Sequence, residues 1–372
     1  MTVNRLVALD MPASVEFADH VRKAWDSGDA VFPIDQRLPQ AAKDSLVEQF
    51  KPSVLIDRTG SVINLPGSEP TEEGDALVIA TSGSTGAPKG VVHTHDSIRA
   101  LLNMSQARLR IDSSTRWLLC LPVSHVAGFS VLARSLVFGN PISILPKFDE
   151  SEVLAAAKSG ATHISLVPTT LNRIDPAIFE SILLGGAAAP PNLPANVTTT
   201  YGMTETFGGI VYNGIPLDGI HVRVADEHIE LQSPSLFRTY RGSKAQLSAE
   251  GWYETGDNGS FTNNVLQVFG RSDDMIITGG ENVWPIAVER VVSTIPGVER
   301  VVVRGIDDAQ WGQRVVAWIV SSNAVAPSLE KVRQHVKQQL PSFCAPTEIR
   351  IVNDIPTTSL GKVDFQTLKN LW

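Results

Sequence analysis

The sequence predicts an α/β protein with a large N-terminal domain, residues 1–271, and a small α+β C-terminal domain, residues 272–372. Between about residues 96 and 184, strand-like and helix-like segments alternate, which indicates mostly parallel, layered sheets with crossover helices. After Gly214, short strands follow one another closely and predict a small β-subdomain that reaches to about residue 271. From Ser272 the pattern changes again to two strands, a helix and a strand. A chain of 372 residues is long enough to bury a core in each domain.

The individual elements follow from apolar periodicity and from turn residues. We expect helices at residues 15–25, 96–109, 126–138, 150–158, 169–174 and 329–340. We expect strands at residues 31–34, 54–57, 76–80, 117–121, 142–145, 163–167, 181–184, 222–224, 228–231, 267–269, 300–305, 315–320 and 348–352. Asp226 and Glu227 separate two of these strands and predict a hairpin turn.

The composition excludes several classes of protein. A net charge of −8 argues against a general nucleic-acid or anionic-membrane surface. No run reaches the roughly 18 apolar residues of a membrane span, and the N-terminus lacks the long apolar segment of a signal peptide. Cys120 and Cys344 lie far apart and match no metal-binding pattern, so two free thiols in a reducing compartment are the simplest interpretation. We therefore expect a cytoplasmic protein without membrane insertion.

The segment Thr81–Gly90, TSGSTGAPKG, follows a predicted buried strand and is rich in glycines and hydroxyls. Such a loop can turn backbone N–H groups toward a polyphosphate, and its lysine adds a positive charge. It is not a Walker loop, because Lys89 does not directly follow Gly86 and Gly90 stands where a Ser or Thr is required. A flexible linker is the alternative. The apolar stretch that begins directly after the loop favours a phosphate-binding loop of another kind.

Four further clusters have functional and structural interpretations that their residue types alone leave open. They are Gly185-Gly186, YGMTET at 201–206, GWYETGD at 251–257 and GRSDD at 270–274. The first allows a flat ring to approach the backbone, or is a plain loop. The second offers an aromatic face, hydroxyls and a carboxylate for Mg²⁺, or is a turn with a solvated acid. The third ends in an aspartate that suits ribose hydroxyls, or is a tight turn. The fourth lies at the predicted domain boundary, and its structural interpretation is a charged linker.

In this order the motifs TSGSTGAPKG, YGMTET, GWYETGD, GRSDDMIITGGENVWP and PTTSLGKVD resemble the acyl-adenylate-forming enzymes, which include acyl-CoA synthetases, carrier-protein adenylation domains and beetle luciferases. The resemblance extends from about Thr81 to the C-terminus, and five ordered motifs are far more specific than any one of them. It implies an enzyme that uses ATP and Mg²⁺ to adenylate a small-molecule carboxylic acid and then transfers the acyl group to the thiol of CoA. It also implies that the C-terminal domain is mobile.

The resemblance assigns roles residue by residue. ATP's β- and γ-phosphates are assigned to Thr81, Ser82, Gly83, Ser84, Thr85, Gly86 and Lys89. The adenine and α-phosphate segments are Gly185 and Gly186, Tyr201 as the stacking ring with Gly202 and Met203, and Thr204 as the α-phosphate contact. Glu205 is the Mg²⁺ ligand, and Asp257 and Arg271 are the ribose-binding pair. Asp273 is the hinge of the mobile domain, and Gly279, Gly280 and Glu281 form a loop that approaches the pantetheine arm.

Lys362 lies in a glycine-containing segment near the C-terminus, SLGKVD. Local residues alone favour an ordinary surface lysine. Its spacing from the hinge and its matching flanks instead imply the catalytic lysine of the family, which stabilises the negative charge that develops when the carboxylate attacks the α-phosphate.

His125 matches an aromatic-or-histidine position that gates the acyl pocket in the family, although a lone histidine beside an apolar helix is often a packing residue. The acyl-pocket candidates are Ser124, His125, Phe129, Thr206, Phe207 and Gly208.

Only 80 residues precede the phosphate loop, fewer than in most members of the family. This compactness resembles the actinobacterial o-succinylbenzoate–CoA ligases of menaquinone biosynthesis and implies o-succinylbenzoate as the acid. Alternatives are a ligase for another aryl or acyl acid, or an adenylation enzyme that loads a carrier protein. A non-catalytic acyl-adenylate binder is disfavoured, because the charges at Lys89, Glu205 and Lys362 are all present. A homodimer is compatible with every one of these expectations.

Overall fold

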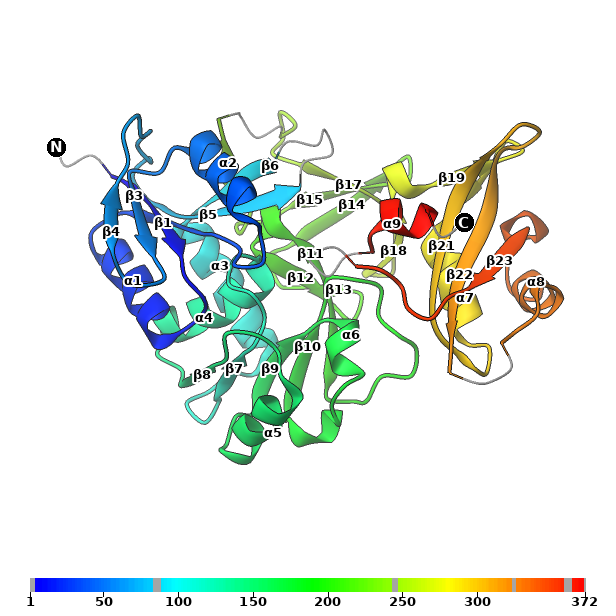
Figure 1. The fold of residues 1–372 in the computed structure, drawn as a ribbon, viewed down its shortest axis with the longest axis horizontal. Helices are drawn as coiled ribbons and strands as arrows, with labels where there is room; N and C mark the ends of the chain where they lie inside the picture. The colour runs from blue at the N-terminus through cyan, green and yellow to red at the C-terminus, as the bar shows by residue number, and fades with distance from the viewer. Residues whose placement is uncertain (1–3, 83–87, 243–246, 323–325, 358–362, 371–372) are drawn as a thin grey trace. The chain divides into compact units, whose positions relative to one another are not determined.

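The computed structural model describes residues 4–82, 88–242, 247–322, 326–357 and 363–370 (Figure 1). The chain divides into two compact units, which are described separately. The first comprises Met1–Ala189, Leu193–Val222 and Leu231–Tyr253, and the second comprises Pro190–Asn192, Arg223–Glu230 and Glu254–Trp372. Both contain helices and sheets, which confirms the predicted α/β class.

The first unit begins with a seven-stranded sheet in the order β16-β6-β5-β2-β1-β3-β4. Its strands are β1 (Leu6–Asp10), β2 (Ala30–Pro33), β3 (Val54–Asp57), β4 (Val62–Asn64), β5 (Asp75–Ser82), β6 (Pro88–Thr94) and β16 (Thr239–Arg241). Strands β1, β2, β3 and β5 run parallel, whereas β4, β6 and β16 pair antiparallel with their neighbours. Helices α1 (Val15–Asp26) and α2 (Gln40–Phe50) connect the early strands, and Phe50 from α2 packs edge-on against Phe32 in the core.

A second seven-stranded sheet has the order β13-β12-β11-β10-β9-β7-β8. Its strands are β7 (Trp117–Leu119), β8 (Ile142–Ile144), β9 (His163–Leu166), β10 (Ser181–Leu184), β11 (Val197–Met203), β12 (Gly208–Tyr212) and β13 (Ile215–Pro216). Five neighbouring strands of this sheet are parallel, as the sequence predicts: β8, β7, β9, β10 and β11. Strands β12 and β13 pair antiparallel at its other edge.

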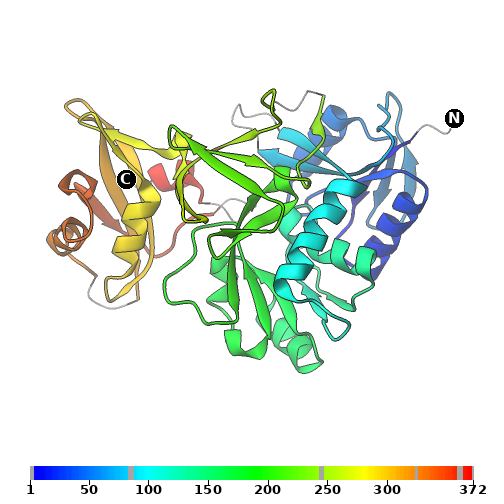
Figure 2. The same ribbon diagram turned by 180° about the vertical axis from the view of Figure 1, so that it is seen from behind.

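Two helices, α3 (His95–Leu109) and α4 (Val126–Phe138), lie between these sheets (Figure 2). Helix α3 contacts β6 of the first sheet and β12 of the second, and α4 contacts α1 as well as β7, β9 and β12. This burial on several sides explains why α4 is almost uniformly apolar. The shorter α5 (Glu150–Lys158), α6 (Pro168–Leu171) and the 3₁₀ turn η1 (Pro176–Ile178) complete the crossovers.

The predicted hairpin lies mostly in the second unit, which includes its residues Arg223–Glu230. Strands β14 (His221–Ala225) and β15 (His228–Gln232) are joined by Asp226 and Glu227, whose φ angles are 48° and 67°. Positive φ at both turn residues is the geometry that tight hairpins favour. With β17 (Tyr253–Thr262) and β18 (Val265–Arg271) they form a four-stranded sheet.

The C-terminal part of the second unit is an α+β layer with a core on each face. It consists of β19 (Ile276–Thr278), β20 (Glu281–Val283), α7 (Pro285–Ser293), β21 (Val298–Asp308), β22 (Gly312–Ser321), α8 (Leu329–Lys337), β23 (Glu348–Ile351) and α9 (Phe365–Lys369), with 3₁₀ turns η3 (Ser272–Asp274) and η4 (Ser342–Cys344). Along β22, Val315, Ala317 and Ile319 pack with residues of α7 and α8. The intervening Val316, Trp318 and Val320 pack with Ile355 and Leu368. Burial on both faces accounts for the unbroken apolar run 315–320.

Two of the motifs lie in strands, where a turn was the structural alternative. Tyr201, Gly202 and Met203 are the last three residues of strand β11. The end of GWYETGD is not a tight turn, because Tyr253 to Asp257 begin the long strand β17. The predicted boundary near residue 271 and the hinge at Asp273 stay predictions. Within the described ranges, no helix combines the length and the apolar character that a membrane span requires.

Candidate active site

The predicted phosphate loop connects the antiparallel strands β5 and β6. Thr81 pairs with Lys89 across this hairpin, and the Thr81 hydroxyl donates to the Lys89 carbonyl at 3.4 Å. Ser82 ends β5. Gly83, Ser84, Thr85 and Gly86 lie outside the described residues. The β5–β6 hairpin therefore brings the two ends of the motif together, and the role of its tip stays a prediction.

Tyr240 joins two of the predicted nucleotide-binding residues. The Lys89 ammonium lies 5.2 Å from the centroid of the Tyr240 ring, and the Tyr240 hydroxyl donates to Glu205 Oε1 at 3.0 Å. The same hydroxyl lies 3.2 Å from the Tyr253 hydroxyl. Burial and the negative charge of Glu205 raise the pKa of Tyr240, so its phenol stays protonated and remains a donor. Tyr240 belongs to no recognised motif, so the sequence alone does not indicate it.

The backbone around Glu205 is held from two directions. Glu205 lies in the 3₁₀ turn η2 (Thr204–Thr206), and its carbonyl accepts a hydrogen bond from Phe237 N at 2.8 Å. The Phe237 ring packs against Tyr240 and Tyr253 at centroid distances of 4.6 and 5.4 Å. These ring contacts fix Tyr240, and the Tyr240 hydroxyl in turn holds the Glu205 carboxylate in one position.

His93 holds the backbone of Thr204, the residue before Glu205. It is fully buried, and its Nε2 lies 2.7 Å from the Thr204 carbonyl oxygen. Because a carbonyl only accepts, Nε2 carries the proton. Burial lowers the pKa of His93 to about 4, so the ring is neutral near pH 7. The sequence signal for this role is weak: His93 directly follows the buried Val91 and Val92 in β6.

The nucleotide segments after β10 and in β11 are closely packed against other backbone. A Cβ on Gly202 would lie 1.9 Å from the Gly208 carbonyl oxygen, and the β11–β12 register shifts between Tyr201 and Gly202. A Cβ on Gly185 would lie 2.5 Å from Thr200 Oγ1, and Gly186 has a φ of 82°. These glycines thus have a packing reason in this fold, and their approach to a bound adenine stays a prediction.

The acyl-pocket candidates on this side are mostly part of the core. Phe129, Thr206 and Phe207 are completely buried, and the two phenylalanine rings contact each other at 6.4 Å. The Thr206 hydroxyl is engaged with the backbone of Met203 and Gly208. Gly208 has a φ of 120°, and the buried Ser124 hydroxyl has no partner among the described residues. Phe129, Thr206 and Phe207 therefore belong to the packed core of the first unit.

His125 belongs to a polar cluster that no sequence motif predicts. Arg37 Nη2 donates to His125 Nε2 at 2.7 Å, and Asp35 Oδ2 lies 3.5 Å from the same nitrogen. Burial acts to raise the pKa of Asp35, but the hydrogen bonds and the positive charge of Arg37 outweigh it and hold that pKa below its usual range. Asp35 is therefore anionic throughout the working pH range.

Arg134 is a second residue that no sequence motif indicates. It lies in α4, is only 3% exposed, and no carboxylate of the described residues pairs with it. Its Nη2 donates to Ser105 Oγ at 2.8 Å, its guanidinium lies 5.0 Å from the Trp117 ring centroid, and its Nε has no partner within the described ranges. A buried cation without a counter-charge is costly, which makes it a candidate for recognising a negatively charged ligand.

The second unit contains the remaining predicted residues. Asp257 and Arg271 lie opposite each other on β17 and β18, with 3.5 Å between Asp257 Oδ1 and Arg271 Nη1. Asp273 lies in η3, directly after Arg271 and Ser272. Gly279 and Gly280, with φ angles of 60° and 86°, form the turn between β19 and β20, and Glu281 begins β20. Lys362 lies outside the described residues.

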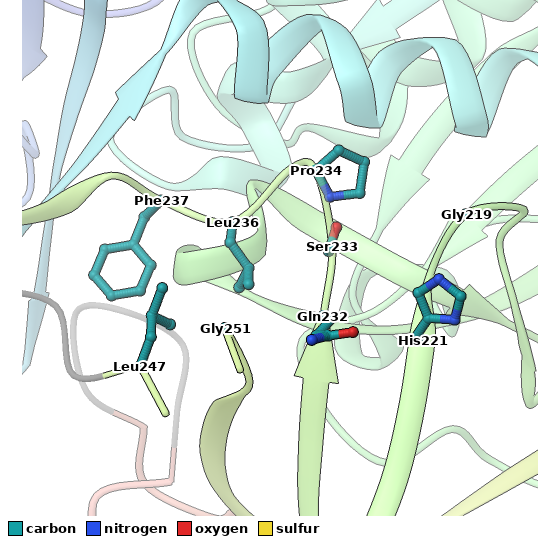
Figure 3. Close-up of a pocket in the computed structure, with 9 residues that line it drawn as sticks. All are labelled: Gly219, His221, Gln232, Ser233, Pro234, Leu236, Phe237, Leu247 and Gly251. Carbon is teal, nitrogen blue, oxygen red and sulfur yellow. The ribbon is translucent and has the colours of Figure 1, made fainter. Parts of the chain in front are cut away.

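The first unit also contains a cavity of about 460 Å³, which is lined by other residues than the predicted nucleotide-binding ones (Figure 3). Phe237, Leu236 and Leu247 form one side of it, and His221 and Gln232 lie on the other. None of Gly185, Tyr201 and Glu205 lines this cavity. It is therefore not the predicted nucleotide site, although Phe237 belongs to both surroundings.

The donor set around Glu205 suits a magnesium ion that arrives with a nucleotide. Among the described residues, no three His, Cys, Asp or Glu side chains gather into a metal-binding group. Mg²⁺ commonly uses one or two protein carboxylates and takes its other ligands from phosphates and water. The single Glu205 carboxylate, oriented by Tyr240, fits that arrangement, in which the protein does not provide a complete cage of ligands.

Comparison with known proteins identifies the class of this protein. The AMP-binding enzyme family model matches residues 13–233, and that of the AMP-binding enzyme C-terminal domain matches residues 287–362. The chain belongs to the AMP-binding enzyme family, as the five motifs indicate.

Within this family, the chain is similar over most of its length to proteins named as 2-succinylbenzoate–CoA ligases. It is 39% identical over 328 residues to a probable 2-succinylbenzoate–CoA ligase of Mycobacterium tuberculosis, covering 81% of this chain and 85% of that one. A 2-succinylbenzoate–CoA ligase of Enterococcus faecalis is 30% identical over 352 residues, covering 83% and 72%.

Solved structures confirm the fold. The o-succinylbenzoate CoA synthetase of Bacillus subtilis, in complex with its acyl-adenylate intermediate, matches with a TM-score of 0.83 and 26% identity, covering 98% of this chain and 88% of that one. ATP-bound MatB from Rhodopseudomonas palustris matches with a TM-score of 0.87 at 22% identity, covering 100% and 89%. The latter similarity concerns the fold alone.

Proposed function

We propose that this protein is an ATP-dependent acid–CoA ligase, which converts a carboxylate and ATP to an acyl-adenylate and pyrophosphate and then forms the CoA thioester. The observation that carries the proposal is the meeting of Lys89 and Glu205 at Tyr240, two residues 116 positions apart by the difference of their numbers. A lysine and a carboxylate at one place supply a positive charge for a polyphosphate and a ligand for its metal ion.

The residues of the chain divide the first step between them. The substrate carboxylate attacks the α-phosphorus, the bond from that phosphorus to the bridging oxygen breaks, and pyrophosphate leaves. Lys89 and the Thr81–Gly90 loop hold the leaving group, and Thr204, with its carbonyl fixed by His93, contacts the α-phosphate. Bound through Glu205, Mg²⁺ supplies charge neutralisation on the phosphate oxygens. Lys362 stabilises the charge that develops on the acyl and phosphoryl oxygens.

In the second step the thiol of CoA attacks the acyl carbon and AMP leaves. Asp257 and Arg271 bind the ribose, and Asp273 is the hinge through which the C-terminal domain changes its orientation between steps. The turn at Gly279, Gly280 and Glu281 then approaches the pantetheine arm.

We infer o-succinylbenzoate as the acid. Two relatives named for this activity, at 39% and 30% identity, support it. The acid also has two carboxylates, of which only one is activated. Buried Arg134, which lacks a carboxylate partner among the described residues, offers a counter-charge for the other. A cytoplasmic location and a homodimer stay predictions.

Pyrophosphate release from the purified protein, measured across a panel of acids with and without CoA, tests the proposal. Release with o-succinylbenzoate and a thioester product that requires CoA are the expected results. Release with a different acid would reject o-succinylbenzoate and keep the ligase. Release with a product that forms only on a phosphopantetheine carrier would favour the carrier-loading alternative. Failure of every acid to release pyrophosphate would contradict the proposed function.

A further inference from the structure

The contact between Arg37 and His125 fixes the protonation form of the imidazole. A guanidinium only donates hydrogen bonds, so His125 Nε2, at 2.7 Å from Arg37 Nη2, must accept. The ring's single proton then lies on Nδ1. No described residue pairs with Nδ1. His125 therefore has one N–H donor available to a ligand.

Asp35 holds the Arg37 guanidinium in the orientation that this contact needs. Arg37 Nε donates to Asp35 Oδ1 at 2.8 Å, and Nη2 donates to Oδ2 at 2.6 Å. The Arg37 backbone N–H also donates to Oδ1, at 3.0 Å. The Asp35 side chain is only 7% exposed, whereas that of Arg37 is 37% exposed. This two-pronged geometry is pre-organised and specific to arginine.

The backbone of His125 is fixed independently of these two residues. Its N–H donates to the Pro122 carbonyl at 3.1 Å, and its carbonyl accepts from Phe129 N at 2.8 Å. A Cβ on Gly128 would lie 2.3 Å from the Pro122 carbonyl oxygen, so the segment before α4 folds tightly over the first turn of the helix. His125 is the N-cap residue of α4, yet its side chain makes no capping bond. Arg37, and not the helix, thus determines where the imidazole lies.

We propose that Asp35 and Arg37 are positioning residues that hold His125 as a neutral Nδ1–H donor to an acceptor oxygen of the acid substrate. This rests on the proposed function, because it requires that His125 borders the acyl-binding site. Protonation of Nε2 would set an N–H against the guanidinium, and the only described acceptor nearby is Asp35 Oδ2 at 3.5 Å. The contacts of this cluster are therefore met by the tautomer whose proton lies on Nδ1.

Two substitutions with opposite electrostatic effects test the proposal. Among the described residues, only Asp35 and Arg37 have a charged group within salt-bridge distance of the imidazole. Arg37→Met leaves the Asp35 charge alone beside the ring and favours the protonated form. Asp35→Asn leaves the Arg37 charge alone and disfavours it. We expect the acidic limb of the pH profile of kcat/KM for the acid to move to higher pH in Arg37→Met and to lower pH in Asp35→Asn.

The kinetic constants separate positioning from a general structural effect. Arg37→Met should raise KM for the acid about tenfold, the effect of one charge-assisted hydrogen bond, with KM for ATP unchanged. Arg37→Lys keeps the charge beside Asp35 but cannot reach both partners in one plane, so it should raise KM for the acid without moving the acidic limb. Arg22→Met breaks an exposed pair with Asp19 in α1 and serves as the matched control, with no change in either constant.

Thermal unfolding of each variant identifies the properly folded proteins. An unchanged KM for the acid in folded Arg37→Met or Arg37→Lys would overturn the proposal. So would a shift of the acidic limb in the same direction in Arg37→Met and Asp35→Asn. Failure of the proposed function is recognised separately, because the wild-type protein would then form no acyl-adenylate at all.

Discussion

At the residue scale, the candidate site depends on side chains that join motif residues to one another. Tyr240 contacts both Lys89 and Glu205, and His93 binds the Thr204 carbonyl. The motif residues themselves could be selected from the sequence because glycines, hydroxyls and charges gather at short spacing. Tyr240, His93 and Arg37 could not, since each acts on a partner more than 30 positions away in the chain and stands in an unremarkable local sequence.

Removal of the Tyr240 hydroxyl tests the orientation of Glu205. Tyr240→Phe keeps the ring beside Lys89 and deletes the donor to the Glu205 carboxylate. A hydrogen bond to a charged group contributes about 1.5–3 kcal/mol. We therefore expect KM for MgATP to rise about tenfold or more in steady-state assays, with a higher Mg²⁺ requirement. Tyr212→Phe, which loses a hydroxyl bonded to Ser105, is the control and should leave KM for MgATP unchanged. Equal effects of the two substitutions would contradict the role of Tyr240.

His93 makes the stability of the protein depend on pH. Its pKa falls from the usual 6.5 to about 4 on folding, so the unfolded chain takes up a proton below pH 6.5 that the folded chain refuses until about pH 4. Stability is therefore lost as the pH falls through this window, by about 3 kcal/mol in total.

His93→Gln keeps a donor for the Thr204 carbonyl and has no titrating group. Urea unfolding between pH 7 and pH 4 should show a smaller loss of stability in this variant than in the wild type, by about the same 3 kcal/mol. Parallel pH profiles of the two proteins would show that His93 does not contribute.

At the element scale, the parallel strands and crossover helices of the second sheet follow from their alternating pattern in the sequence. The strands that the sequence analysis missed or placed wrongly are those that bend or pair at a distance. Strand β16 is three residues long and joins β6 from 151 positions away by the difference of their first residues, 239 and 88. Strand β11 continues into the YGMTET motif because Gly202 lets β12 approach, a tertiary contact that no local pattern encodes.

Substitution of Gly202 tests whether the β11–β12 pairing holds the motif in place. In Gly202→Ala the new methyl group would meet the Gly208 carbonyl oxygen, at 1.9 Å before relaxation. We expect a loss of stability of about 3 kcal/mol or more and a raised KM for ATP, measured by urea unfolding and kinetics. Gly67→Ala, with a φ of 68° and open space around it, is the control for backbone strain alone and should cost about 1 kcal/mol. A cost for Gly202→Ala no larger than that of the control would contradict the close approach.

At the scale of the whole molecule, the sequence motifs are divided between two compact units. Lys89, Tyr201 and Glu205 belong to the first, whereas Asp257, Arg271 and the hinge candidate Asp273 belong to the second. The sequence pattern instead placed Asp257 and Arg271 in the N-terminal domain, residues 1–271, and that domain boundary stays a prediction. Which acid is bound could not be derived from spacing, because the candidate residues for recognising it, Arg37, His125 and Arg134, come from separate elements.

The proposed division of labour makes the two half-reactions separable. Lys362 is proposed to act only while the carboxylate attacks the α-phosphate, so Lys362→Ala should abolish adenylation and largely spare thioester formation from a supplied acyl-adenylate. Single-turnover assays of each half-reaction measure this directly. Lys369→Ala, a lysine of α9 with no proposed role, is the control. Normal pyrophosphate release by Lys362→Ala would remove Lys362 from the catalytic residues.

The central claim, that the acid is activated as an adenylate, can be tested by the fate of a carboxylate oxygen. In the proposed chemistry, that oxygen becomes bonded to the α-phosphorus and remains with AMP when CoA takes the acyl group. Turnover of o-succinylbenzoate labelled with oxygen-18 in its carboxylates, with ATP, Mg²⁺ and CoA, should therefore give AMP that carries one labelled oxygen per thioester formed, detected by mass spectrometry. Label in inorganic phosphate with release of ADP, or a thioester without label in AMP, would contradict it.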